Sequence, residues 1–437
     1  MSPTKAFFVL VVLTVCGASA FAGGYQNNAQ GARAMGMGGA YVAQASDGSA
    51  IFFNPAGLAF QNGFKVMLGT TMIMPSSTWK PTTKTVGTTT TPYTTATDMV
   101  SQTFTPINAY ISYAFDNGLT VGVGVYNPYG LGSEWPVDWD GRQMSVKSNL
   151  TTWYINPTVA YRFSDQFAVG VGVSYVAASV KLSQRTGTLG SLAPLAPSPT
   201  DGTVNLDGTG NSINWNVGIL YKPTKDLSVG VSYRSLTKVD FTGNATFTGM
   251  NVLSSFFPGG TATTTLPFPS SLFAGMACNI TKDFTVEADY QYVGWSSYDQ
   301  LNFGLPTGPA SPLGVLQKAQ TLVKNWDNAF VIRVGGEYRM EKLAVRAGFV
   351  YDKTPQPDAA VEPMNPDANR MAFTVGFGYE ISKNVNVSAF CQMISMSDRN
   401  GVITSKTALY PVIPADVFAG AYSGGTNLFG INVGLNF

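Results

Sequence analysis

Few residues in this chain are suited to catalysis or metal binding. The sequence contains no histidine, which excludes His-based acid–base catalysis, Ser-His-Asp triads and His-ligated metals. It also lacks a glycine-rich phosphate-binding loop of the P-loop type. Cys278 and Cys391 fall in predicted strands far apart in the chain, where we expect small apolar side chains and no disulfide. We therefore predict no enzymatic activity, no cofactor and no metal site.

The composition favours a large β structure that faces lipid. Charged residues make up 12% of the 437 residues, about half the usual share in soluble globular proteins. The chain contains 47 glycines and 12% aromatic residues, and its net charge is +1. Because it has no basic excess, we do not expect it to bind nucleic acid.

Residues 1–22 are predicted to be a secretory signal peptide. Lys5 supplies the positive charge, Ala6–Val15 the apolar segment, and Ala20-Phe21-Ala22 the cleavage site. The apolar segment is too short to span a membrane. A lipoprotein modified at Cys16 is the alternative, which the bulky residue before the cysteine disfavours.

From Phe64 onward, apolar residues alternate with small or polar residues. In Gln166–Val176, phenylalanine, valine and tyrosine share one face, and alanine, glycine and serine share the other, which is the period of a β-strand. A soluble sandwich would show the same alternation. Aromatic residues near the strand ends and a strict alternation of long and short connections favour a transmembrane barrel with both termini on the periplasmic side.

The pattern predicts about fourteen antiparallel strands. Since no apolar run after the signal is long enough for a membrane helix, the chain must cross a membrane as strands. The last strand ends on Phe437 and looks like a signal for the outer-membrane assembly machinery. The predicted strand centres lie near Gly69, Tyr110, Val123, Ile155, Val173, Val217, Tyr233, Gly275, Ala288, Val334, Gly348, Val375, Val387 and Val433.

The stretch Ala29–Phe60 fits neither a helical nor a strand period. It is rich in glycine and alanine and nearly uncharged. We predict that it fills the lumen as a plug. The domains are then the signal peptide (1–22), an N-terminal hatch (23–62) and the barrel (63–437).

Several short motifs follow one another along the chain. They are Gly24-Tyr25-Gln26, the small residues of Gly36–Ala43, Asp47, Asn54-Pro55-Ala56, Asn127-Pro128-Tyr129-Gly130-Leu131, Gly218-Ile219-Leu220-Tyr221, Ser232-Tyr233-Arg234-Ser235, Val239-Asp240-Phe241-Thr242-Gly243 and Pro366-Asp367-Ala368-Asn369-Arg370. In this order they resemble the FadL-type family of outer-membrane channels for long-chain fatty acids and aromatic hydrocarbons. The resemblance covers nearly all of the mature chain.

The resemblance implies an outer groove between loops, an internal apolar pocket near the N-terminus, and sideways release where the third strand kinks inward. Tyr25 and Asn54-Pro55-Ala56 would belong to the hatch and its gate. Gly122 and Gly124 are candidates for the kink because glycine weakens a strand. Gly170-Val171-Gly172 repeats their spacing, so plain lumen-facing glycines are the alternative.

Two loops with apolar and aromatic residues are candidates for the outer groove, with ordinary loop packing as the alternative. We also expect Leu313–Trp326 to form a short amphipathic helix beside the groove. The groove candidates are Tyr129, Leu131, Trp135, Trp139, Leu189, Leu192 and Leu195.

Arg162 and Lys324 are candidate contacts for a substrate carboxylate. The family places an arginine at a strand end like that of Arg162, and a guanidinium suits a carboxylate. The Trp-Lys-Asp-like run of the family reads Trp326-Asp327-Asn328 here, with the lysine displaced to Lys324. That departure leaves room for a neutral hydrocarbon. Further lumen charges are expected at Arg234, Arg333, Arg346, Glu287, Asp289, Glu337 and Glu380.

We therefore expect a monomeric outer-membrane barrel that passively admits hydrophobic small molecules, with long-chain fatty acids first and hydrocarbons second. Its expected partners are the substrate, outer-membrane lipid and lipopolysaccharide, and the barrel assembly machinery. An adhesin or structural envelope barrel and a polar porin are the rival classes. The plug-like N-terminus argues against an adhesin, and a porin would be expected to have rings of lumen charges.

Overall fold

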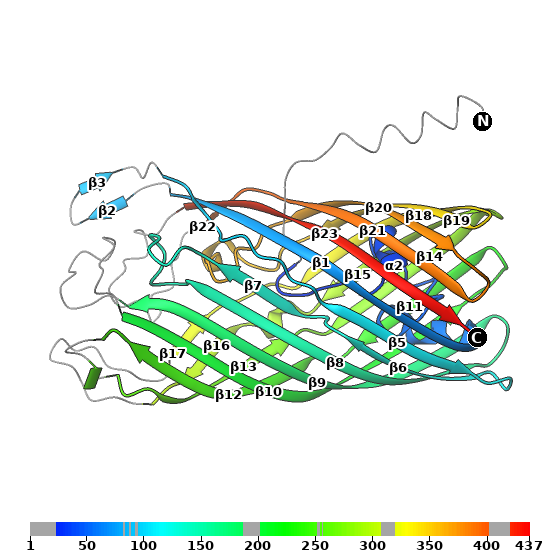
Figure 1. Cartoon of the computed structure of the whole chain (residues 1–437), viewed down its shortest axis with the longest axis horizontal. Coiled ribbons are helices and arrows are strands. Elements are labelled where there is room, and N and C mark those ends of the chain that lie inside the picture. Colours follow the sequence, from blue (N-terminus) through cyan, green and yellow to red (C-terminus); the bar gives the residue numbers. More distant parts are fainter. Residues whose placement is uncertain are drawn as a thin grey trace, which may run out of the picture.

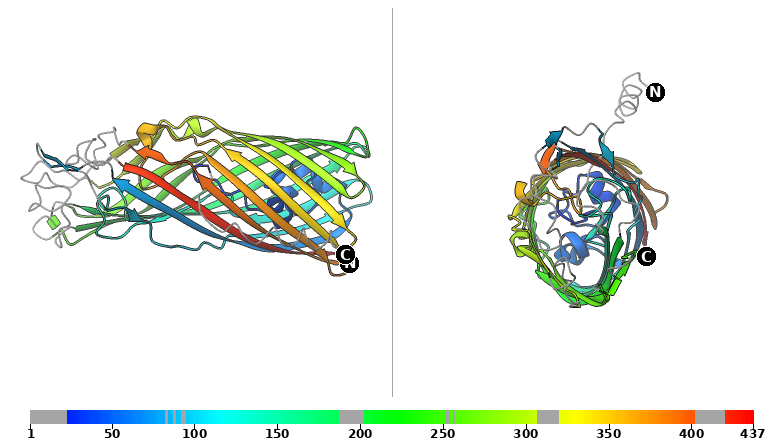
Figure 2. Two further views of the ribbon diagram at one scale, coloured as in Figure 1. Left: turned by 90° about the horizontal axis from the view of Figure 1, so that it is seen from above. Right: turned by 90° about the vertical axis from the view of Figure 1, so that its left-hand side faces the viewer.

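The computed structural model describes residues 23–81, 84–86, 89–91, 95–186, 202–250, 254–255, 257–306, 320–401 and 420–437. The predicted signal peptide lies outside these residues. The strands form a closed antiparallel barrel of 14 strands (Figures 1 and 2). The barrel closes where β1 (Gly63–Pro81) pairs with β23 (Gly420–Asn436), in a register that runs from Lys65 opposite Asn436 to Pro81 opposite Gly420.

Several wall strands are interrupted, so that two labelled segments make up one strand of the barrel. After β1 the wall continues through β5 (Ile107–Ala114), β6 with β7 (Leu119–Tyr126, Gly130–Glu134), β8 (Lys147–Arg162), β9 (Phe167–Thr186), β10 (Gly202–Tyr221), β11 with β12 (Leu227–Arg234, Thr237–Thr248), β14 with β13 (Ser271–Thr281, Gly260–Phe268), β15 with β16 (Phe284–Val293, Gln300–Gly304), β18 with β17 (Ala329–Met340, Gln320–Val323), β19 (Leu343–Asp352), β20 (Arg370–Glu380) and β21 with β22 (Val385–Met396, Arg399–Gly401).

Small elements accompany the wall. The short strand β4 (Thr97–Asp98) pairs with β1, while β2 (Lys84–Val86) and β3 (Thr89–Thr91) form a separate pair. Two 3₁₀ turns, η4 (Trp295–Ser297) and η5 (Asp358–Ala360), lie in connections between strands. No helix in the described part of the chain is long and apolar enough to cross a membrane.

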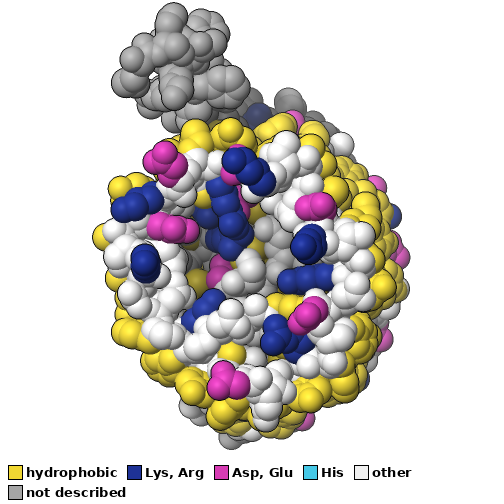
Figure 3. Space-filling view, turned by 90° about the vertical axis from the view of Figure 1, so that its right-hand side faces the viewer, with side chains coloured by type: hydrophobic (Ala, Val, Ile, Leu, Met, Phe, Trp, Pro, Cys, Tyr) yellow, Lys and Arg dark blue, Asp and Glu magenta, His cyan; other side chains and the backbone are white. Residues whose placement is uncertain are grey.

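The wall shows the predicted alternation. In β8, buried and exposed residues alternate from Ser148 to Tyr161. The exposed members of the strands are large and apolar, as at Val171, Val173 and Tyr175 of β9. From the end with the short turns, Figure 3 shows hydrophobic side chains around the outside and charged and other polar side chains at the mouth. This distribution suits a wall in lipid around a polar lumen.

Each of the fourteen predicted strand centres falls within a strand of the wall. The prediction of a helix over Leu313–Trp326 is wrong in its described part, because Gln320–Val323 forms β17. The short turns join the strands at residues 115–118, 163–166, 222–226, 282–283, 341–342 and 381–384.

The hatch, residues 23–62, occupies the lumen (Figure 2, right). It contains α2 (Ala32–Gly36), α3 (Ala50–Phe53) and η2 (Pro55–Phe60). Most of its side chains are buried, and Ile51, Phe52 and Phe53 belong to the main apolar cluster inside the barrel. The predicted plug is therefore part of the packed interior.

Glycines of the wall make room for the hatch. A Cβ on Gly218 would lie 2.1 Å from Asn54 Oδ1, and one on Gly335 would lie 2.2 Å from the Met37 carbonyl oxygen. A side chain at Gly218 would collide with Asn54, and one at Gly335 would collide with the hatch backbone. Four further wall glycines are equally close to the hatch, because a Cβ on any of them would lie 2.2–2.5 Å from a hatch backbone atom. They are Gly170, Gly230, Gly348 and Gly376.

Replacing Gly218 by valine is expected to displace the hatch while the barrel still assembles, because the added side chain meets Asn54 and not the neighbouring strands. Gly208 lies on the same strand, and a Cβ there has its nearest neighbour at 3.5 Å. We expect Gly218→Val to raise ion conductance in planar bilayers and protease cleavage within the hatch, and Gly208→Val to change neither. Equal behaviour of the two variants would contradict this contact.

Candidate functional site

An apolar pocket lies inside the wall next to the first residues of the hatch. It encloses about 600 Å³, part of which is open to solvent, within the range of small-molecule sites. Its lining comes from the hatch, from six wall strands and from two connections. The residues are Tyr25, Leu131, Ser148, Asn149, Leu150, Val180, Leu182, Phe241, Thr264, Leu266, Tyr298, Leu301, Phe303, Trp326, Glu362, Met364 and Asn365.

Tyr25 forms one end of this pocket. Its ring packs edge-on against Trp295, with 4.6 Å between centroids, and against Tyr298 at 5.7 Å. Its hydroxyl donates a hydrogen bond to the Pro267 carbonyl oxygen. Burial raises the pKa of Tyr25 well above its usual value, so the ring stays neutral. The predicted hatch residue is a fixed aromatic surface rather than a frayed terminus.

Tyr129 and Leu131 line the interior and not an outer groove. Leu131 borders the pocket. The Tyr129 ring stacks on Phe268 at 4.8 Å, and its hydroxyl donates to the Pro269 carbonyl oxygen at 3.0 Å. Both were predicted as residues of an outer groove, but Leu131 belongs to β7 of the wall and Tyr129 comes directly before that strand.

Trp135 and Trp139 are buried, at 1% and 4% exposure, contrary to the expected exposed groove. Their rings stack with centroids 4.4 Å apart. Trp135 Nε1 donates to the Pro363 carbonyl oxygen, and Trp139 Nε1 donates to the Ser145 carbonyl oxygen, each at 2.9 Å. Contacts between loops bury them, which strand periodicity does not reveal. Leu189, Leu192 and Leu195 lie outside the described residues.

Lys324 lies beside the pocket and already has a carboxylate partner. It forms an ion pair with Glu362, which lines the pocket. Burial acts to lower the pKa of Lys324, but the attraction of Glu362 outweighs it and the pKa is raised. The ammonium therefore stays charged, and its charge is neutralised by a side chain of the protein itself.

Arg162 lies far from this pocket. It is the last residue of β8, and its backbone N–H donates to Gly118 in the neighbouring short turn at 2.9 Å. Leu150 of the same strand lines the pocket. The twelve residue steps from Leu150 to Arg162 span about 40 Å at about 3.3 Å per residue. The structure does not bring Arg162 and Lys324 together.

The third strand is continuous at the two predicted kink glycines. Its pairing with β8 runs in one register from Leu119 to Tyr126. Gly122 and Gly124 instead face the hatch, where a Cβ on Gly124 would lie 2.9 Å from Ile51 Cγ2. Their absent side chains make room for Ile51, as at the other wall glycines.

The third strand is interrupted just beyond, at residues 127–129. Asn27 of the hatch donates its backbone N–H to the Pro128 carbonyl oxygen at 2.8 Å. The Gly130 N–H donates to the Tyr25 carbonyl oxygen at 2.9 Å. The hatch thus supplies hydrogen-bond partners to the third strand where β6 ends, whereas the pairing with β8 is unbroken at Gly122 and Gly124.

Asn54 makes hydrogen bonds both within the hatch and to the barrel wall. Its Nδ2 donates to the carbonyl oxygens of Val42 at 2.9 Å and Ile219 at 3.0 Å. Its Oδ1 accepts the Ala56 N–H at 3.2 Å, which caps η2. Pro55 occupies the first turn of η2, where a missing N–H costs nothing.

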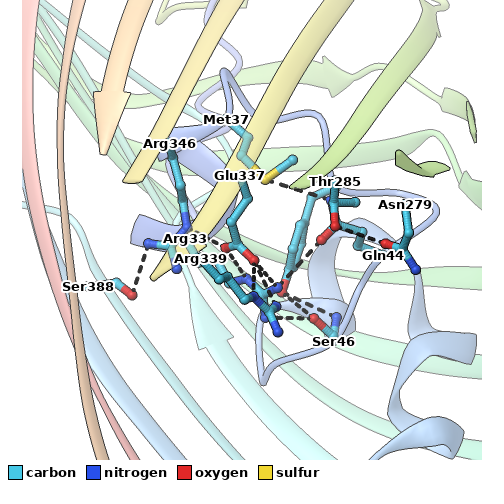
Figure 4. A network of polar contacts seen from close by, with 11 residues as sticks. Arg33, Met37, Gln44, Ser46, Asn279, Thr285, Glu337, Arg339, Arg346 and Ser388 are labelled. Carbon is cyan, nitrogen blue, oxygen red and sulfur yellow. Dashed lines mark hydrogen bonds and ion pairs between the residues drawn. The ribbon is translucent and has the colours of Figure 1, made fainter. Parts of the chain in front are cut away.

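Buried charges hold the opposite side of the hatch (Figure 4). Glu337 of β18 accepts hydrogen bonds from Arg33 of the hatch at 2.9 and 3.0 Å, from Arg346 at 2.6 Å and from Arg339 at 2.7 Å. One carboxylate thus binds three guanidinium groups from hatch and wall. Sequence alternation identified Glu337 and Arg346 as lumen residues but gave no sign of their partner Arg33.

The other predicted lumen charges differ in their roles. On β15, Asp289 accepts the N–H groups of Tyr41 and Val42 at 2.7 and 3.1 Å, and Glu287 accepts that of Ala43 at 2.6 Å. Glu380 is exposed at the end of β20, on the same face of the strand as the buried Gly376 and Gly378.

A closed barrel with an apolar outer face, a hatch in its lumen and an apolar pocket beside the hatch defines a transport protein of the bacterial outer membrane. The chain belongs to the outer membrane protein transport protein family (OMPP1/FadL/TodX), whose model matches residues 13–437.

Relatives support this assignment. Outer membrane protein P1 of Haemophilus influenzae is 24% identical over 78% of this chain and 77% of its own length. The long-chain fatty acid transport protein of Salmonella typhi is 25% identical over 61% of this chain and 64% of its own length. The fold matches that of a Pseudomonas aeruginosa FadL homologue, with a TM-score of 0.81, 17% identity, and coverage of 95% of this chain and 100% of the homologue. It also matches the P. putida toluene transporter TodX, with a TM-score of 0.70, 17% identity, and coverage of 96% of this chain and 99% of TodX.

Neutralising Glu337 as Glu337→Gln is expected to loosen the hatch, because three guanidinium groups then lose their shared carboxylate. Breaking a buried ion pair on one side costs about 3–5 kcal/mol. We expect a lower unfolding temperature and faster cleavage of the hatch by protease. The exposed Glu380 provides the control, and an equal effect of Glu380→Gln would contradict the role of the network.

Proposed function

We propose that this protein passively admits hydrophobic small molecules across the outer membrane, long-chain fatty acids first. The observation that carries the proposal is the apolar pocket between the wall and Tyr25. Each CH₂ group removed from water contributes about 0.8 kcal/mol, so such a pocket holds an alkyl chain without chemistry or an energy source. The transport proteins named among the relatives support the substrate class.

A neutral hydrocarbon is the second candidate, and the Lys324–Glu362 pair favours it. A fatty acid carboxylate that approached Lys324 would have to displace Glu362 or leave the pair undisturbed. A hydrocarbon meets no such competition in the pocket. The toluene transporter among the similar structures has the same fold and shows that this architecture accommodates an aromatic hydrocarbon channel.

The proposed route leads from the outer loops into the pocket, past Tyr25, and out through the wall at residues 127–129. The break in the third strand lies beside the pocket, because Tyr25 binds Gly130 directly. Movement of the hatch would gate release. The signal peptide, a monomeric state and contacts with lipopolysaccharide and the assembly machinery remain part of the proposal.

The direct test is purification from membranes in mild detergent, followed by mass spectrometry of bound apolar molecules and uptake into proteoliposomes. Recovery of fatty acids or hydrocarbons, together with their uptake, would support transport. Absence of apolar ligands combined with large open-pore conductance would point to a porin. Absence of both would leave an adhesin or structural barrel.

Glu362→Gln separates the two substrate candidates. Removing this carboxylate frees the buried Lys324 ammonium, so we expect carboxylate ligands such as dodecanoate to bind about tenfold more tightly, the scale of a charged hydrogen bond. Dodecane binding should remain within about twofold. Calorimetry on the purified protein measures both, and an unchanged dodecanoate affinity would remove Lys324 from ligand recognition.

Replacing Asn54 and Pro55 together by alanine is expected to reduce uptake while the barrel still assembles, because the hatch loses its cap and its bond to Ile219. Heat-modifiable mobility on gels reports assembly, and radiolabelled fatty acid reports uptake. Gln61→Ala, at the end of the hatch, keeps the Asn54 cap and serves as the control. Unchanged uptake in the double variant would exclude Asn54 and Pro55 from gating.

A further inference from the structure

A second cavity lies on the other side of the first hatch residues. It encloses about 500 Å³, part of it open to solvent, and among the described residues its lining shares no member with that of the first pocket. Asn27, Asn28 and Ala29 contribute to it from the hatch, while β18, β19, β20, β21 and β23 form its wall. Two residues before Asn27, Tyr25 faces the first pocket.

One side of this cavity is apolar. Ala29 and Met35 of the hatch belong with Val331, Val350 and Ile394 of the wall to one buried hydrophobic cluster, and all of them line the cavity. This surface comes from both hatch and wall, so a ligand there would lie between them. It suits an alkyl chain.

Two further lining residues are charged and pair with each other, although Arg370 Nε has no hydrogen-bond partner in the described part of the chain. Arg370 pairs with Asp352 at 3.3 Å and also with Asp367. Asp352 in addition accepts the Gly23 N–H at 2.9 Å. These groups tie the start of the hatch to the wall, and the Arg370 charge is already neutralised by two carboxylates.

Arg333 is the lining cation that has an open donor and, among the described residues, no ion-paired carboxylate. It is 3% exposed, and its Nη2 donates to Gln291 Oε1 at 2.6 Å. Within the described part of the chain, its Nη1 has no hydrogen-bond partner. A buried donor without a partner costs free energy, and a ligand oxygen would remove that cost.

Asp289 does not bind the free N–H group of Arg333, although it lies opposite Arg333 in the pairing of β15 with β18. One of its oxygens is bound by the N–H groups of Tyr41 and Val42. No ion pair between Asp289 and Arg333 is present among the described residues. The guanidinium therefore keeps a free N–H group in a cavity that has an apolar wall.

We propose that this second cavity binds an amphiphile with one carboxylate and an alkyl chain, with the carboxylate on Arg333 Nη1 and the chain along Met35, Val350 and Ile394. The inference rests on the proposed function and gives it a site of carboxylate recognition distinct from Lys324. A guanidinium binds a carboxylate through charge-assisted hydrogen bonds. Glu362 occupies Lys324 in the first pocket, whereas no carboxylate among the described residues pairs with Arg333.

The position of the cavity fits a late step of passage. Asn27 lines it and is bound to the interrupted third strand, through its backbone N–H to Pro128 and through Nδ2 to the Asn127 carbonyl oxygen at 2.9 Å. A ligand held here would lie beside the residues that connect the hatch to the break in the wall.

Binding of dodecanoate and dodecanol to the detergent-purified full barrel tests the proposal, because the two probes differ only in the head group. Arg333→Gln is expected to weaken dodecanoate binding about tenfold or more, the scale of a lost charged hydrogen bond, and to leave dodecanol within about twofold. Arg333→Lys should retain part of the dodecanoate affinity. Ile394→Trp, which fills the apolar side, should weaken both ligands at this site.

Arg162→Gln removes the same type of side chain at the rim and serves as the control. If Arg333→Gln changes neither ligand, or weakens both equally, the proposed carboxylate site is wrong. Heat-modifiable gel mobility shows whether each variant is folded. If Arg333→Gln does not fold, the ligand affinities of the more conservative Arg333→Lys decide the test. Failure of any apolar ligand to bind or cross overturns the proposed function, whereas normal dodecanol transport without head-group discrimination overturns only this inference.

Discussion

A strand inside a lipid bilayer has no water to satisfy its backbone, so every N–H and C=O group must find a partner within the protein. The pairing of β1 with β23 meets this requirement by closing the wall. Closure creates a lumen too wide for the wall's own side chains to fill. The hatch fills much of it, and the interrupted third strand shows the same constraint locally, because hatch atoms take over bonds that a neighbouring strand would make.

Filling the lumen with irregular chain creates a second problem, since that chain also carries backbone donors. Asp289 and Glu287 accept three of them, and Asn54 Oδ1 accepts the Ala56 N–H. The wall therefore supplies carboxylates where the hatch supplies N–H groups, and glycines where the hatch comes closest. In the described part of the chain, two cavities remain beside the first hatch residues, each with an apolar side.

Local periodicity was sufficient to predict the strands, their short turns, the lumen-facing side and the location of the hatch. It did not predict that Trp135 and Trp139 are buried or that Glu362 pairs with Lys324, because those contacts join connections that are distant in sequence. Gly122 and Gly124 show the same limit: their composition suggested a kink, while their actual neighbour is Ile51. In the sequence, residues 127–129 stood out only as part of the Asn127–Leu131 motif, and the alternation of apolar residues gave no sign that the strand is interrupted there.

One hatch contact lies at the seam of the barrel. The Ala32 N–H donates to Asn432 Oδ1 at 2.6 Å, and Asn432 lies on β23 opposite Gly69 of β1. A slip of one residue between the first and last strands would turn Asn432 toward lipid and an apolar neighbour toward the lumen. The contact between Ala32 and Asn432 is therefore compatible only with the native register of the first and last strands, so the hatch and the closure of the barrel stabilise each other.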